Sequence, residues 1–163
     1  MCFFVAIGVK TNGLELVEKA MKPDLVSSPV RNSDLNCCLP KGYSFCWLIS
    51  KGCSCDLIPE SPLKRDDLEK KYEKRGWSKE KIRRVVFEKK MSITKKSKTL
   101  QFESLLNEII IFSNPLYVFF RWFYGEIDNE KIEIIKNIEI YFEEFTIMEI
   151  RKYEDCLLKI QRK

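Results

Sequence analysis

The chain has 163 residues, of which 45% are hydrophobic and 33% are charged, with a formal net charge of +5. This is the size and composition of one globular domain, and it excludes a disordered chain. There is no histidine and no GxxxxGK or GxGxxG loop, which excludes Ser-His and Cys-His nucleophiles, zinc sites that need imidazole, and the standard phosphate loops.

The N-terminal segment predicts a strand followed by a short helix. The run "CFFVAIGV" is apolar on both faces, and Thr11-Asn12-Gly13 ends it. Residues 12–21 then place Leu14, Val17 and Met21 on one side of a helix.

A loop-rich stretch and a second strand follow. Pro23, Pro29 and Pro40 punctuate a segment that contains Cys37 and Cys38. Residues 43–50, "YSFCWLIS", alternate between aromatic or aliphatic side chains and smaller ones. The alternation predicts a strand with one face on the core.

Residues 61–98 predict a basic helical hairpin that projects from the body of the protein. Ser61-Pro62 is a good helix start, and Gly76 and Ser78 are placed to end one helix and to cap the next. The second helix carries apolar residues at i, i+3 and i+4, namely Ile82, Val85 and Val86.

The C-terminal part predicts a helix over 100–112, a stop at Ser113-Asn114-Pro115, and a central strand over 116–124 whose charged residue is Arg121. Beyond it, β-branched residues with partial alternation favour two or three antiparallel strands, and a helix over 129–145 is the competing interpretation. We therefore expect a single α+β domain over 1–163. Its mixed or antiparallel sheet would contain the N-terminal strand, 43–50, 116–124 and the C-terminal strands, packed on helices.

No segment is typical of an export signal or a membrane span. The best membrane candidate, residues 109–120, has twelve uncharged residues and is interrupted by Asn114-Pro115, whereas a span needs about 20. We expect a cytoplasmic protein that makes no membrane contact and keeps its seven cysteines mostly reduced.

The stretch "KGCSCDLI", residues 51–58, places two thiols one residue apart. In an extended backbone Cys53 and Cys55 project to the same side. With Cys37 and Cys38 they make a set of four candidate zinc ligands. Three alternatives stay open: a strained, reducible Cys53–Cys55 disulfide, a functional thiol with Asp56 as a base or ligand, and small buried apolar residues.

Cys2 is a further candidate nucleophile. If Met1 is removed, the thiol and the α-amino group share one residue, and the amine can act as the base that histidine does not supply. A Met-Cys start followed by an apolar strand resembles amidotransferases that use an N-terminal cysteine. The resemblance covers these residues and implies a catalytic role for Cys2.

Charge is distributed unevenly along the chain. Residues 63–98 contain fifteen Lys/Arg and six Asp/Glu, whereas residues 126–155 contain ten acidic and four basic residues. Phosphates or carboxylates of an acidic partner would meet the basic side chains, and two aromatic rings are placed to stack on bases. The candidate partner-binding residues are Arg83, Arg84, Lys89, Lys90, Lys95, Lys96, Tyr72 and Trp77.

Two other interpretations account for the same charges. Pairs at i, i+4 such as Asp66–Lys70 and Glu80–Arg84 neutralise charge on a helix surface. The basic hairpin can also face the acidic half of the same chain or of a second copy. The leading functional hypothesis is thus a binding or regulatory protein whose hairpin engages an acidic protein or nucleic acid. The alternatives are a cysteine-dependent or metal-supported enzyme centred on Cys53 and Cys55, and a self-associating structural protein.

Overall fold

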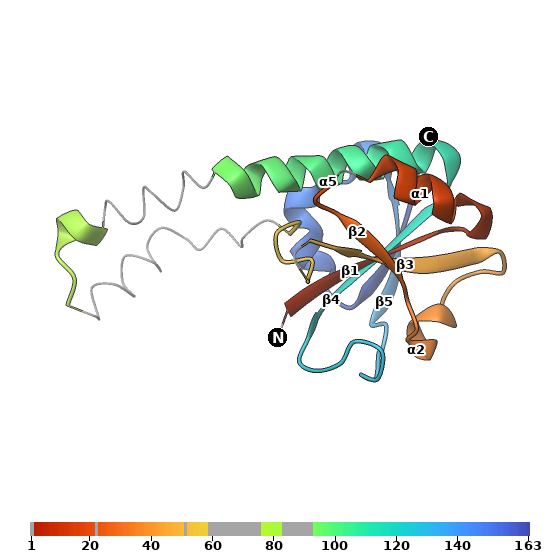
Figure 1. Cartoon of the computed structure of the whole chain (residues 1–163), viewed down its shortest axis with the longest axis horizontal. Coiled ribbons are helices and arrows are strands. Elements are labelled where there is room, and N and C mark those ends of the chain that lie inside the picture. The colour runs from red at the N-terminus through yellow and green to blue at the C-terminus, as the bar shows by residue number, and fades with distance from the viewer. Residues whose placement is uncertain (1, 22, 51, 59–75, 83–92) are drawn as a thin grey trace.

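The computed structural model describes residues 2–21, 23–50, 52–58, 76–82 and 93–163, with the backbone alone for 93–98 (Figure 1). Its centre is a six-stranded sheet in the order β2-β3-β1-β4-β6-β5. Neighbouring strands are antiparallel except for β5 and β6, which are parallel. The predicted α+β class is therefore confirmed, with a mixed sheet. The strands are β1 (Cys2–Lys10), β2 (Val26–Pro29), β3 (Tyr43–Ile49), β4 (Leu116–Phe123), β5 (Lys136–Tyr141) and β6 (Cys156–Gln161).

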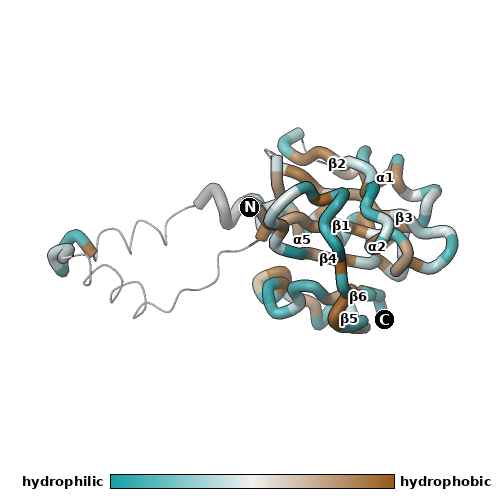
Figure 2. Tube along the Cα trace, turned by 90° about the horizontal axis from the view of Figure 1, so that it is seen from below, coloured by the Kyte–Doolittle hydropathy of each residue, from teal (hydrophilic) through white to brown (hydrophobic). Residues whose placement is uncertain are grey.

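Helices cover one face of this sheet, and a short helix and a loop cover the other (Figures 1 and 2). On the first face, α1 contributes Val17, α5 contributes Phe102 and Leu106, and a 3-10 helix contributes Ile147 and Ile150. On the second face, α2 and the loop 124–135 lie over the sheet. The helices are η1 (Thr11–Gly13), α1 (Leu14–Ala20), α2 (Ser33–Asn36), α5 (Ile93–Phe112), η2 (Phe142–Glu144) and η3 (Ile147–Tyr153). Residues 79–82 are also helical.

The central strands are apolar because both of their faces are buried. In β3, Phe45 and Trp47 point into the core on the α2 side, while Cys46 and Leu48 belong to the core under α1 and α5. The sequence prediction of one core face for 43–50 is therefore wrong. Alternation of large and small side chains indicated a strand, but the smaller set also meets a packed layer.

Three other sequence expectations need correction. The stretch around Pro29 contains β2, a short edge strand, where proline is tolerated because its missing N–H faces away from the sheet. The helix expected from residue 100 begins at Ile93. The competing helix over 129–145 is not formed, since β5 occupies 136–141.

The two C-terminal strands run parallel to each other, not antiparallel as expected. Residues 142–155, which include η2 and η3, carry the chain from the end of β5 back to the start of β6. A parallel pair needs such a crossover of a dozen or more residues. Side-chain alternation reports burial and contains no information about strand direction.

Most of the predicted hairpin lies outside the described residues. Within 76–82, Gly76 has φ of +72°, and Ser78 accepts a hydrogen bond at its Oγ from the Lys81 N–H. These are the conformations expected for a helix end at Gly76 and a cap at Ser78. Trp77 is partly buried, and since the helices on either side of 76–82 lie mostly outside the described residues, its expected packing between the hairpin and the body stays a prediction. Figures 1 and 2 show the segment 76–82 away from the sheet. Among the described helices, none is long and apolar enough to cross a membrane.

Candidate metal centre

Three cysteines from two distant parts of the chain meet at one end of the sheet. The sulfur atoms of Cys2, Cys53 and Cys55 all lie within 4.8 Å of one another, and all three residues are partly exposed. They are the only group of three or more potential Cys, Asp or Glu metal ligands in the part of the chain that the structure describes. The CxC pair singled out from the sequence is therefore completed by Cys2.

A tight turn after β3 positions the CxC pair. Ser50 and Cys53 form an isolated antiparallel bridge, in which the Ser50 N–H donates to the Cys53 carbonyl at 2.7 Å. Gly52 sits inside this turn with φ of +93°, a conformation that side chains larger than glycine rarely adopt. The chain thus reverses directly behind β3, and Cys53 and Cys55 return to the end of the sheet where β1 begins.

Ser54 fixes this returning chain against β1. The pairing of β1 with β3 ends at Val5 and Leu48. Beyond it, the Ser54 N–H donates to the Phe3 carbonyl at 2.9 Å, and the Val5 N–H donates to Ser54 Oγ at 2.9 Å. The same hydroxyl donates to the Leu48 carbonyl, and Ser54 is fully buried. Its two cysteine neighbours are consequently held beside Cys2, the first residue of β1.

The surroundings of Cys55 favour its neutral thiol when no metal is bound. Burial raises the pKa of Cys55 to about 11. A hydrogen bond in which the neutral Cys55 thiol is the donor to Cys53, and the charges of the Cys53 and Cys2 sulfurs, act in the same direction. The Phe3 N–H opposes this effect, because it donates to Cys55 Sγ at 3.3 Å and stabilises the thiolate. A metal ion must therefore displace a proton from Cys55 on binding.

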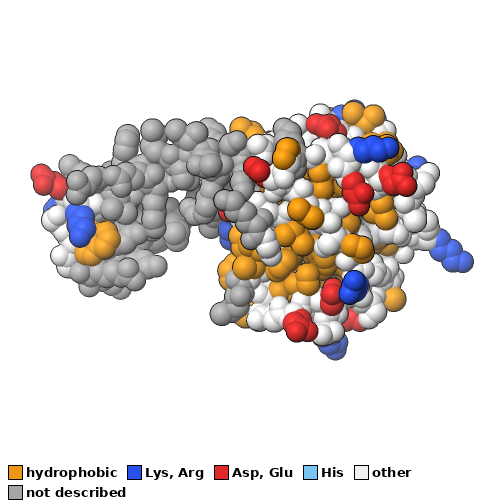
Figure 3. All heavy atoms as spheres, viewed as in Figure 1, with side chains coloured by type: hydrophobic (Ala, Val, Ile, Leu, Met, Phe, Trp, Pro, Cys, Tyr) orange, Lys and Arg blue, Asp and Glu red, His pale blue; other side chains and the backbone are white. Residues whose placement is uncertain are grey.

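The cluster lies in a largely apolar part of the surface. Figure 3 shows apolar side chains gathered near the end of the sheet where β1 begins. Cysteine is coloured with the apolar side chains in that view. Most of the charged side chains lie around the margin of this face. The ring of Phe3 contacts that of Trp122 edge to face, with 4.5 Å between the ring centroids. The rings of Phe4 and Phe123 also meet edge to face, with centroids 5.8 Å apart.

The structure does not bring Cys37 and Cys38 into this group. Both are exposed and follow α2, before the start of β3, whereas Cys53 follows its end. A strand of seven residues spans about 20 Å. Leu39, the next residue, approaches Gly8 in the second half of β1, away from Cys2. The predicted set of four ligands is thus replaced, among the described residues, by a set of three.

The predicted partner-binding residues are mostly outside the described residues. This applies to Tyr72, Arg83, Arg84, Lys89 and Lys90. Lys95 and Lys96 lie in the first turns of α5. Trp77 is mostly buried, and Lys81 lies over its ring at 4.5 Å. Their proposed role in partner binding stays a prediction.

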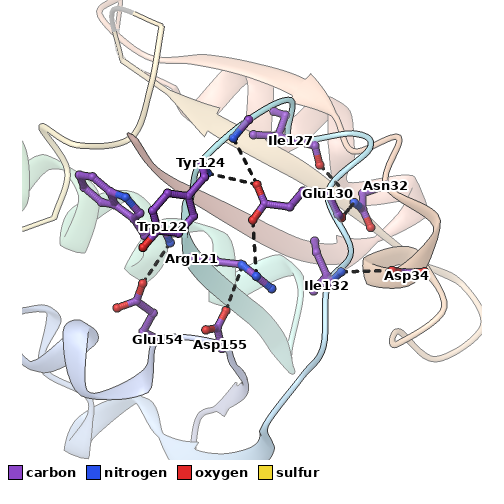
Figure 4. Close-up of polar contacts among 11 residues, drawn as sticks. Asn32, Asp34, Arg121, Trp122, Tyr124, Ile127, Glu130, Ile132, Glu154 and Asp155 are labelled. Carbon is purple, nitrogen blue, oxygen red and sulfur yellow. Dashed lines mark hydrogen bonds and ion pairs between the residues drawn. The ribbon is translucent and has the colours of Figure 1, made fainter. Parts of the chain in front are cut away.

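A second polar cluster surrounds Arg121, the charged residue of β4 (Figure 4). Its guanidinium lies 3.4 Å from Glu130 and 3.4 Å from Asp155 Oδ1. The latter contact is an ion pair without good hydrogen-bond geometry. The other oxygen of Glu130 accepts from the Tyr124 and Gly125 N–H groups at 3.1 and 3.3 Å. Arg121 therefore ties the loop 124–135 to the sheet.

Residues of α2 hold the far side of the same loop. The Asn32 amide donates to the carbonyls of Ile127 and Glu130, while its oxygen caps α2. Asp34 accepts from the Ile132 N–H at 3.1 Å. These hydrogen bonds hold the loop 124–135 in place over one face of the core. We therefore interpret the cluster as structural.

The sequence analysis did not group Cys2 with the CxC pair, although the sequence contains the information needed to do so. If the N-terminal strand and 43–50 are antiparallel neighbours, the start of the first lies beside the end of the second. Cys2 and the CxC pair then meet. The sequence analysis predicted both strands but did not pair them.

Comparisons with known proteins do not assign a family. No protein-family model matches the chain, and no curated protein or solved structure matches it.

Proposed function

We propose that the protein binds one soft metal ion through the thiolates of Cys2, Cys53 and Cys55. The observation that supports this proposal is the convergence of three sulfur atoms within 4.8 Å, from residues about fifty positions apart. Thiolates are the ligands that Zn²⁺ and Cu⁺ prefer in proteins. All three cysteines are partly exposed, so an ion can reach them from solvent.

The spacing suits a metal. Zinc–thiolate bonds are about 2.3 Å long, so ligands around one tetrahedral ion lie about 3.8 Å apart. This separation is inside the 4.8 Å limit that the three sulfurs satisfy, so small side-chain rotations suffice to bind an ion. The backbone does not need to move, because Ser54 already holds it.

A bound ion would link the start of β1 to the turn after β3. Such a link stabilises the folded chain because the unfolded chain does not hold the three thiols together. The proposed role is therefore binding with a structural or regulatory consequence. A metal-supported reaction at the same site is the enzyme alternative, and it needs a substrate that the described surface does not identify.

Elemental analysis after dialysis against limiting Zn²⁺ tests the proposal. We expect about one metal atom per chain in the wild type and loss of it in Cys2→Ser, Cys53→Ser and Cys55→Ser. Cys37→Ser and Cys38→Ser are matched controls, since both cysteines are exposed and outside the group, and they should retain the metal. Equal metal content in all five variants and the wild type would contradict the proposal.

A second candidate function is the binding of an acidic partner by the basic segment. The observation that favours it is that α5 begins at Ile93, so that Lys95, Lys96 and Lys98 lie on a helix and not on an extended tail. Figure 1 shows this end of α5 reaching beyond the sheet. Basic residues on a helix that reaches beyond the sheet are suited to contact with phosphates or carboxylates. Self-association through the acidic half stays the alternative.

A further inference from the structure

We infer that the ion preferred by the Cys2, Cys53 and Cys55 site is monovalent copper, bound by three thiolates in a trigonal arrangement. This inference rests on the proposed function and specifies its ligand. The inference follows from the three thiolate donors, from the lack of a fourth protein donor among the described residues, and from the preference of soft thiolates for Cu⁺.

The site offers three sulfurs and no fourth protein ligand among the described residues. Asp56 follows Cys55 directly, but its carboxylate does not belong to the group of mutually close ligand atoms. Ser54 lies between the two cysteines, but its hydroxyl accepts from the Val5 N–H and donates to the Leu48 carbonyl. The Ser54 hydroxyl is therefore already engaged in bonds to β1 and β3.

The number of thiolate donors distinguishes Cu⁺ from Zn²⁺, because the two ions prefer different coordination numbers. Structural zinc sites are almost always four-coordinate, so zinc here would need a further ligand beyond the three thiolates of the described residues, such as a water molecule. Soft thiolate ligands also select Cu⁺, which three sulfurs satisfy. With metal–sulfur bonds of about 2.3 Å, a planar trigonal complex places its sulfurs about 4.0 Å apart. The three sulfurs lie within 4.8 Å of one another, so side-chain rotation can bring them to that spacing without a change in the turn.

The surroundings stabilise such a complex. Three thiolates around Cu⁺ carry net negative charge, and the Phe3 N–H directed at Cys55 Sγ, at 3.3 Å, offsets part of it. Hydrogen bonds of this kind orient metal ligands and tune their donor strength. Apolar side chains gather near this end of the sheet (Figure 3), and the thiols are partly exposed, so an ion can reach them.

The test is competition between the metals in the whole, reduced protein under nitrogen. Cu⁺ is supplied as its complex with the chromophoric chelator bicinchoninate, and Zn²⁺ is titrated separately against a zinc indicator. X-ray absorption then counts the sulfurs around each bound ion. We expect one Cu⁺ per chain with three sulfur neighbours and no oxygen, and displacement of any bound Zn²⁺.

Cys2→Ser separates three-thiolate binding from binding by the CxC pair alone. We expect Cu⁺ affinity to fall more than about a hundredfold in this variant, because even second-layer changes at metal sites cost 10- to 100-fold, and Cys38→Ser should bind as the wild type does. The circular dichroism spectrum without metal checks that Cys2→Ser is folded. If it is not, the sulfur count of the wild type decides the question.

The outcomes distinguish this inference from the proposed function. Two sulfurs around Cu⁺, or unchanged affinity in folded Cys2→Ser, would overturn the trigonal site. Zn²⁺ bound by three sulfurs and one oxygen, and not displaced by Cu⁺, would overturn the inference and leave the proposed function intact. Failure of both ions to bind would overturn both.

Discussion

The hydroxyl of Ser54 accepts a hydrogen bond from the backbone N–H of Val5 at 2.9 Å, across 49 positions of sequence. Through this contact residue 54 takes the place beside β1 that a longer β3 would have occupied. The position of both CxC thiols depends on it, because they are the neighbours of Ser54 on either side. The serine between the two cysteines therefore positions the thiols of the site.

Replacement of Ser54 by alanine tests this dependence. The variant leaves the Val5 N–H and the Leu48 carbonyl, both buried, without their partner, and each unsatisfied group costs about 1–3 kcal/mol. We expect urea denaturation to show a loss of about 2–4 kcal/mol in the free energy of unfolding. Ser27→Ala is the control, since its bond to Glu18 is exposed, and it should change stability by less than about 0.5 kcal/mol. Equal effects of the two variants would contradict the role given to Ser54.

Arg121→Met tests the structural interpretation of the second polar cluster. The change keeps the length of the side chain but leaves the carboxylates of Glu130 and Asp155, which are about one quarter exposed, without their cation. We expect a loss of about 1–3 kcal/mol, measured by urea denaturation, and faster proteolysis within the loop 124–135. Lys152→Met removes the exposed pair with Glu149 and should cost less than about 1 kcal/mol. An Arg121 variant as stable as this control would show that the cluster does not hold the loop.

Cys46 predicts a loss of stability in alkali. Burial, with a smaller contribution from the charge of Glu18, raises the pKa of this thiol from 9.0 to about 12. The folded chain keeps a proton that the unfolded chain releases, so the resulting stability is complete below about pH 9 and is lost as the pH rises to about 12. Urea denaturation between pH 8 and about 11 should therefore show a steeper decline for the wild type than for Cys46→Ala.

Cys37→Ala is the matched control for that series, because Cys37 is exposed. Its stability should fall with pH as steeply as that of the wild type. Parallel curves for Cys46→Ala and the wild type would mean that the Cys46 thiol ionises in the folded protein as readily as in the unfolded chain.

The acidic-partner hypothesis predicts a separation of binding from stability. Reversal of Arg83, Lys89 and Lys90 to glutamate should abolish binding of an acidic partner, tested with a heparin column and with single-stranded nucleic acid at rising salt. The melting temperature should stay almost unchanged, since exposed charges contribute little to folding. A control that reverses Lys19, Lys41 and Lys131, which are exposed elsewhere on the body, should still bind. Loss of stability in the first variant would indicate that the basic segment docks on the acidic half of the chain.

The sequence predicted the central strands well because their apolar runs are too long and too uniform for a surface element. It predicted less well where burial is partial. Residues 93–98 are mostly Lys, Thr and Ser, so the first turns of α5 have no apolar period to mark them. The strand β2 is four residues long and ends at Pro29, which in sequence is the signal of a loop.

The sequence predicted the two thiols of the CxC pair but not the contribution of Cys2 to the same site. The closeness of Cys53 and Cys55 follows from their spacing, which is local. The closeness of Cys2 follows from the order and register of β1 and β3, in which Val5 is opposite Leu48. Alternation of side chains does not determine strand neighbours, so the grouping with Cys37 and Cys38 was preferred on proximity in sequence alone.

Alkylation of the thiols with and without metal, read by mass spectrometry, tests the central claim most directly. We expect bound metal to slow the labelling of Cys2, Cys53 and Cys55 together, while Cys37 and Cys38, which are exposed, label at the same rate in both states. The three-thiolate site would be contradicted if metal slowed the labelling of Cys53 and Cys55 but left the labelling rate of Cys2 unchanged.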